Sequence, residues 1–187
     1  MTFGELVDFM AKICYTTSDK SAYAIHEIYK DRPSMHEAAM RQYIYAKISI
    51  CCFLSLQASN SSNVDQAINV VQALLDKMCG IFKSMPSSMN YGCNESEMKY
   101  MVGEYQVGDQ FDFEHMALMF VGAIGDSNVF NLSKMVQIFE CCEKDLRNQL
   151  LGFYQKKSGS AGASSGCGCT VATLGLLVIS ILVCVLL

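Results

Sequence analysis

Cysteine and histidine are the residue types of this chain that could act as nucleophiles or as metal ligands. The chain has ten Cys and three His. Cys51-Cys52 and Cys141-Cys142 are adjacent pairs within apolar segments, and the Cys-x-x-Cys spacing of zinc and redox sites does not occur. We therefore expect these thiols to be free and to pack in the core as small apolar side chains.

The histidines form no recognised catalytic or metal-binding pattern either. His26, His36 and His115 stand apart, and none has a Cys or a carboxylate at the spacing of a known motif. His115 lies in a strongly apolar segment, which favours a place in the core or at its rim. Gly122-x-x-Gly125 follows a helical pattern rather than a strand, so it does not predict a phosphate-binding loop. We expect no enzymatic activity, no metal and no cofactor.

Composition excludes two further classes of protein. The chain has 187 residues, a net charge of −4 and 51% hydrophobic residues. An acidic balance argues against a nucleic-acid-binding protein, and the apolar content argues against a disordered chain. All charged residues lie at or before Lys157. This boundary predicts a cytosolic helical domain at 1–157, a Gly/Ser linker at 158–169 and an apolar segment at 170–187.

The apolar segment has the length of a membrane-spanning helix. Its 18 residues carry no charge, and as a helix they would span about 27 Å, close to the ~30 Å of a hydrocarbon core. The N-terminal residues resemble no signal peptide. Together these features predict a transmembrane tail anchor with the domain facing the cytosol. We expect the mitochondrial outer membrane, with the endoplasmic reticulum as the alternative because no basic residue follows the segment.

Three cysteines in the last twenty-one residues are candidates for lipid attachment. Cys167 and Cys169 directly precede the apolar segment, where palmitoylation is common. The final four residues, which begin at Cys184, fit a prenylation pattern. Since Cys184 would lie inside the spanning helix, we favour the anchor over prenylation.

Helical spacing of apolar residues predicts about seven helices in the first 157 residues. The capping pattern Thr2-x-x-Glu5 begins the first. Two segments, Ile48–Leu56 and Asp112–Ile124, are apolar on nearly every side, which indicates central helices. We therefore expect an all-α globule around buried central helices. The expected helices are one from Thr2, Ala22–Tyr29, one from Ser34 to a break at Asn60, one from Asn63 to Phe82, Glu95–Val107, Asp112–Ile124 and Asn131–Lys157.

Methionine is frequent on the apolar faces of these helices. The chain has 12 Met, and their flexible side chains suit surfaces that accept varied apolar partners. An amphipathic partner helix would place its i, i+3/i+4 and i+7 side chains in such a groove. Core packing is the alternative role for any single Met. The methionines concerned are Met78, Met98, Met101, Met116, Met119 and Met135.

The C-terminal third resembles a known family. The residues that carry the resemblance are 116–121 (Met-Ala-Leu-Met-Phe-Val), 134–136 (Lys-Met-Val) and 152–157 (Gly-Phe-Tyr-Gln-Lys-Lys), followed by the spacer and the anchor. This arrangement is similar to the Bcl-2-like family of apoptosis regulators, and most of all to the divergent poxviral inhibitors of the myxoma type. The resemblance implies a Bcl-2-like helical bundle.

A second alignment with the same family is possible. Residues 131–140 resemble the first homology motif of the cellular members, with Lys134 in the position of the motif's arginine. That alignment leaves one helix before the anchor, too few for the fold. We therefore prefer the alignment in which Asp112–Ile124 is the central helix. Without the arginine, binding would rest on apolar contacts.

The resemblance also implies a site and a mechanism. Helices 66–82 and 95–107 would form the walls of a groove, with Asp112–Ile124 as its floor. The groove would capture the Bcl-2 homology 3 helix of pro-apoptotic proteins, block permeabilisation of the mitochondrial outer membrane and so inhibit apoptosis. The expected contact residues are Val71, Leu75, Met78, Met98, Met101, Val102, Tyr105, Phe113, Met116 and Phe120.

Two other functions stay open at this point. The first is a tail-anchored membrane adaptor, although the uninterrupted heptads of a coiled coil are missing. The second is a poxviral inhibitor of innate immune signalling that uses the same helical fold.

Overall fold

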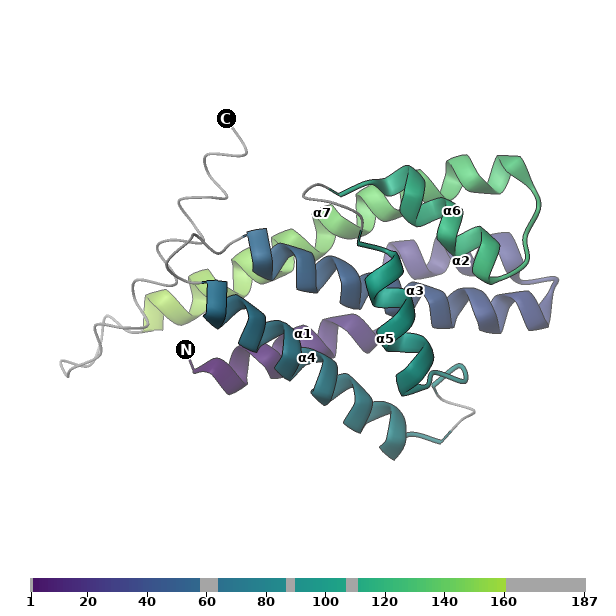
Figure 1. Ribbon diagram of the computed structural model, residues 1–187. Coiled ribbons are helices and arrows are strands. Elements are labelled where there is room, and N and C mark those ends of the chain that lie inside the picture. The colour runs from purple at the N-terminus through teal and green to yellow at the C-terminus, as the bar shows by residue number, and fades with distance from the viewer. Residues whose placement is uncertain (1, 58–63, 87–89, 107–110, 161–187) are drawn as a thin grey trace.

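The computed structural model describes residues 2–57, 64–86, 90–106 and 111–160, which form seven helices and no strand (Figure 1). The all-α class expected from the sequence is confirmed. The helices are α1 (Phe3–Tyr15), α2 (Lys20–Tyr29), α3 (Pro33–Gln57), α4 (Val64–Ser84), α5 (Glu95–Glu104), α6 (Phe113–Ala123) and α7 (Val129–Ser160).

Polar residues cap the starts of four helices. The Thr2–Glu5 capping box is formed as expected: the hydroxyl of Thr2 accepts from the backbone N–H of Glu5, and the Glu5 carboxylate accepts from the Thr2 N–H. Asp19, Asn94 and Asp112 accept backbone hydrogen bonds in the same way at the starts of α2, α5 and α6. These caps satisfy N–H groups that have no partner within the helix.

The central helix is α3, which packs against each of the other six helices. Fifteen of its 25 residues are buried, including every residue from Ile48 to Leu54. The expectation that Ile48–Leu56 lies at the centre is therefore confirmed for most of that segment. A helix with apolar side chains on all sides keeps them away from water only when other helices surround it.

The expectation that Asp112–Ile124 is the central helix is wrong. The corresponding helix, α6, packs mainly on α7 and α3, and it lies at one side of the molecule in Figure 1. Its Leu118 side chain is 57% exposed. The prediction failed because α6 is short. In so short a helix, a few apolar residues that face outward are enough to make the sequence apolar on nearly every side.

Helix α7 runs past the predicted end of the domain. Its 32 residues continue to Ser160, three residues into the expected linker, and span about 48 Å. None of the helices in the described part of the chain is long and apolar enough to cross a membrane. The predicted anchor at 170–187 and the lipidation candidates Cys167, Cys169 and Cys184 lie outside the described residues.

The thiols that the structure describes are all free. Cys51, Cys52 and Cys142 are buried, as expected for small core side chains. Cys141 is exposed, which corrects the expectation that both members of its pair pack in the core. Adjacent residues on a helix point about 100° apart, so only one of this pair faces α3.

A charged pair is built into the core where α2 begins. The ammonium of Lys47, 2% exposed, lies 2.9 Å from a carboxylate oxygen of Asp19 and donates to the carbonyl of Thr16 at 2.6 Å. Tyr43 donates a third hydrogen bond to Asp19. Burial raises the pKa of Asp19, but the Lys47 charge and these hydrogen bonds outweigh it, so the pKa is lowered. The pair fixes the start of α2 against α3.

Candidate helix-binding groove

Helices α2 and α7 lie beside each other and run in opposite directions. At one end the Ser21 hydroxyl donates to the carbonyl of Ile138 at 3.4 Å. At the other end the Tyr29 hydroxyl donates to Asp126 at 2.8 Å, just before α7 begins. Asn131 donates to the same carboxylate at 2.7 Å. Two anchored ends hold the two helices at a fixed separation.

A groove of about 580 Å³ lies between the two helices on the surface of the molecule. Ala24 and Ile28 on α2 are partly buried, and Ile138 on α7 is buried, so these side chains form an apolar floor. The remaining lining residues are Lys20, Ser21, Glu27, Lys134, Gln137, Cys141, Lys144 and Asp145. Because the lining comes from one face of each helix, the groove follows the helix axes.

The rim of the groove carries mostly positive charge. Lys20, Lys134 and Lys144 are exposed, and none forms an ion pair with the described residues. Glu27 is already paired with Lys30 at 2.8 Å. The hydrogen bond from Lys30 lowers the pKa of Glu27. The rim therefore offers three free ammonium groups in a chain whose net charge is −4.

An exposed aromatic residue at the start of α7 lies in line with two residues that line the groove. Phe130 is 81% exposed, and its neighbour Val129 is 77% exposed. Phe130, Gln137 and Lys144 are seven residues apart, about two helical turns, so they lie along one edge of α7. Exposed large apolar side chains next to a groove mark an interaction surface more often than isolated ones do.

The shape and lining of the groove suit a third helix. Two neighbouring helices present a channel into which the side-chain ridge of another helix can pack. The ten residues of α2 provide about 15 Å of wall, enough for roughly three turns of a partner. Partner residues at i, i+3/i+4 and i+7 would reach the apolar floor.

The contact residues expected from the family resemblance lie elsewhere. Seven of the ten are buried in the core, and Val71, Leu75 and Phe113 are partly buried. This conformation leaves those seven little surface to offer a ligand, and their role in binding stays a prediction. The buried seven are Met78, Met98, Met101, Val102, Tyr105, Met116 and Phe120.

The core contacts of these residues explain their burial. Tyr105 donates to Gln42 of α3 at 2.8 Å, and Phe120 packs edge-on against Phe139 of α7 with ring centroids 5.4 Å apart. Helix α3 packs against both expected walls, α4 and α5, while α6, the expected floor, touches α5 through His115. Five of the six methionines on apolar faces are buried as core side chains, and Met119 is partly buried.

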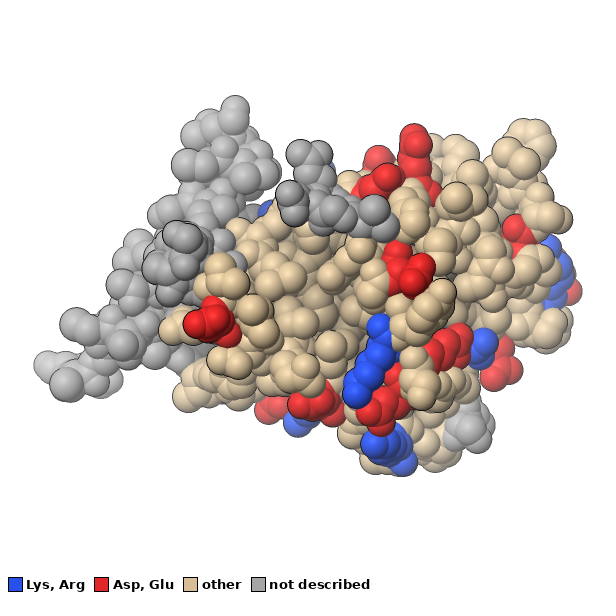
Figure 2. Space-filling view, in the orientation of Figure 1, with Lys and Arg blue, Asp and Glu red and all other residues tan. Residues whose placement is uncertain are grey.

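Helix α4 nevertheless presents an apolar stripe. Val64 and Ile68 are 42% and 52% exposed, and they continue the line of Val71 and Leu75 at helical spacing. Figure 2 shows a broad area without charged side chains over α3 and α4. This stripe is a second candidate surface.

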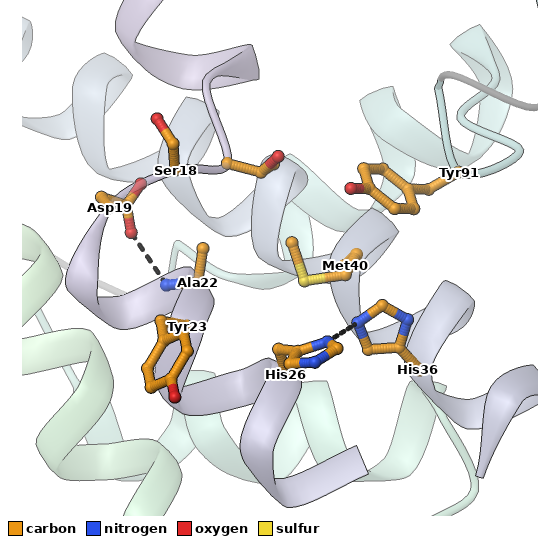
Figure 3. A pocket seen from close by; sticks show the side chains of 9 residues that line it. Ser18, Asp19, Ala22, Tyr23, His26, His36, Met40 and Tyr91 are labelled. Carbon is orange, nitrogen blue, oxygen red and sulfur yellow. Dashed lines mark hydrogen bonds between the residues drawn. The ribbon is translucent and has the colours of Figure 1, made fainter. Parts of the chain in front are cut away.

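A second cavity, of about 240 Å³, lies between α2 and α3 (Figure 3). His26 Nδ1 and His36 Nε2 meet on its wall, 3.0 Å apart. Burial lowers the pKa of His36, and the nearby His26 lowers it further. The described residues contain no group of three or more ligands that could hold a metal ion. Sequence reasoning missed this pair because a spacing of ten residues matches no motif.

The expectation that His115 lies in the core or at its rim is confirmed. This residue is partly buried, and its Nε2 lies 2.9 Å from the carbonyl oxygen of Glu104, at the end of α5. It occupies a place at the rim of the core.

No protein-family model, curated protein or solved structure matches this chain. The likeness to the Bcl-2-like family therefore stays a prediction from the sequence. The groove between α2 and α7 was also missed from the sequence. Its apolar floor consists of a few residues on each helix, and no local pattern indicates that two segments more than a hundred residues apart pair in space.

Proposed function

We propose that this protein captures an amphipathic helix of a pro-apoptotic protein and thereby inhibits apoptosis. The observation that carries helix capture is the groove between α2 and α7, with its apolar floor of Ala24, Ile28 and Ile138. A rigid groove costs little conformational entropy when a partner binds, which favours affinity. The partner class rests on the resemblance of the sequence to the Bcl-2-like family.

The proposed mechanism is sequestration. A Bcl-2 homology 3 helix held in the groove could no longer engage the proteins that permeabilise the mitochondrial outer membrane. The predicted anchor at 170–187 would keep the domain at the same membrane as its targets. Confinement to one surface raises the effective concentration of both partners without any added contact.

The direct test is calorimetric titration of the full-length chain, kept in mild detergent, with a panel of Bcl-2 homology 3 peptides. We expect at least one peptide to bind with a Kd of about 1 μM or tighter, which corresponds to about −8 kcal/mol. If no peptide binds more tightly than tens of micromolar, the proposal is wrong.

Two matched substitutions locate the binding surface. Ile28→Glu places a charge on the floor of the α2–α7 groove, and Leu75→Glu places one on the α4 stripe; both side chains are partly buried on helices. We expect Ile28→Glu to weaken peptide binding at least tenfold and Leu75→Glu to leave it unchanged. Circular dichroism checks that both variants remain folded. The reverse result would place the site on α4.

A further inference from the structure

We propose that the groove between α2 and α7 selects partner helices whose apolar stripe is flanked by acidic residues. This inference rests on the proposed helix capture and adds a charge preference to it. The partner it describes is an amphipathic helix of about three turns with Asp or Glu beside its apolar side chains.

Three lysines surround an apolar floor. Lys134 and Lys144 belong to α7, and Lys20 belongs to α2, so cations lie on both sides of the groove. Each of them lacks an ion-pair partner among the described residues. Lysine stems can cover apolar surface while their ammonium groups stay in water, so they can frame a bound helix without being desolvated.

The acidic groups of the rim do not cancel this charge. Glu27 is held by Lys30 at 2.8 Å, which leaves Asp145 as the lining carboxylate without an ion pair in the described chain. Three ammonium groups therefore face one free carboxylate. Complementary charge at an interface sets orientation and partner choice more than it sets raw affinity.

The uneven placement of the lysines also gives the groove a direction. Because α2 and α7 are antiparallel, Lys20 and Lys144 lie toward the Ser21 end, and Lys134 lies toward the Tyr29 end. Phe130 is one helical turn before Lys134 and adds an exposed aromatic side chain at that second end. A partner helix would thus place more acidic residues at the end near Lys20 and an apolar residue against Phe130.

Two helical peptides test the preference. They share one apolar stripe, and the flanking positions are Glu in the first peptide and Gln in the second. Fluorescence anisotropy with the full-length chain should show the Glu peptide binding about tenfold more tightly at low salt. The difference should shrink as ionic strength rises, because salt screens exposed charge pairs.

Charge reversal at the rim supplies the matched control. Lys134→Glu with Lys144→Glu should abolish or reverse the preference, while Lys12→Glu with Lys156→Glu changes the net charge equally at exposed sites outside the groove. The control pair should keep the preference. Equal, salt-independent binding of both peptides would overturn the charge preference and leave helix capture standing. Failure of both peptides to bind would overturn helix capture itself, and the preference with it.

Discussion

At the scale of single residues, His26 and His36 form a hydrogen-bonded pair of imidazole rings on the wall of the cavity between α2 and α3. Their ring nitrogens lie 3.0 Å apart and can share one proton between them. Asp19 lines the same cavity and pairs with Lys47, whereas Glu27 pairs with Lys30 and has its pKa lowered in part by His26. Tyr23 and Tyr91 complete the polar surroundings of the cavity.

The lowered pKa of His36 makes stability depend on pH. Unfolded histidine titrates near 6.5, so the unfolded chain takes up this proton first as the pH falls. The contribution of neutral His36 to the stability of the folded state is therefore fully present above about pH 6.5. It is lost as the pH falls through the lower pKa that His36 has in the folded state. We expect the melting temperature of the wild type to decline between pH 7 and pH 5, and His36→Gln to flatten that decline.

The control for this prediction is His115→Gln, which removes a histidine from a different contact. Thermal unfolding monitored by circular dichroism across the same pH series provides the measurement. Parallel curves for the wild type and His36→Gln would show that the pair contributes nothing to the pH dependence.

At the scale of elements, the end of α6 depends on one glycine. Gly125 has a φ of +71°, and its N–H donates to the carbonyl of Gly122. The N–H of Asp126 donates to the carbonyl of Val121, which completes a Schellman motif. The turn that follows positions Asp126 for its hydrogen bond with Tyr29, and so fixes one end of the α2–α7 groove.

Glycine-to-alanine substitutions at two positions near the end of α6 should have opposite effects on the stability of the protein. A Cβ at Gly125 would meet no atom within 4 Å, so Gly125→Ala suffers only from the positive φ and should destabilise by about 1 kcal/mol. Gly122→Ala also meets no atom within 4 Å, and it lies within the helix. It should stabilise by about 0.5–1 kcal/mol. Urea unfolding of both variants measures the difference, and equal effects would contradict the role given to Gly125.

Local signals predicted the helices well and their packing poorly. Caps such as Thr2 and Asp112 act through hydrogen bonds within a few residues, so the sequence displays them directly. Whether an apolar side chain faces the core depends on partners far away in the chain. Leu118 and Phe120 are both apolar and lie on one helix, yet Leu118 is 57% exposed and Phe120 is fully buried. For the same reason the expected contact residues turned out to lie mostly in the core.

At the scale of the whole molecule, the anchor predicted at 170–187 would connect the domain to a membrane. A chain that ends at Ser160 keeps all of α7 and lacks the apolar segment. We expect the full-length chain to sediment with membranes and to co-localise with a mitochondrial outer-membrane marker. The shortened chain should be released into the soluble fraction. Co-localisation with an endoplasmic reticulum marker would show that this membrane is the location instead. Equal release of both chains would contradict the predicted anchor.

The antiparallel pairing of α2 with α7 also governs when the groove can exist during synthesis. Ser21 and Ile138, which touch across it, are 117 residues apart in the chain. A ribosome makes α2 among the first of the described helices and α7 as the last of them, so the apolar face of Ala24 and Ile28 has no partner while the segments between them are made. Exposed apolar faces of this kind are where nascent chains aggregate or recruit chaperones. The α2–α7 groove can therefore form only after the part of α7 that lines it, as far as Asp145, has been made, and a chain truncated before that part has no such groove.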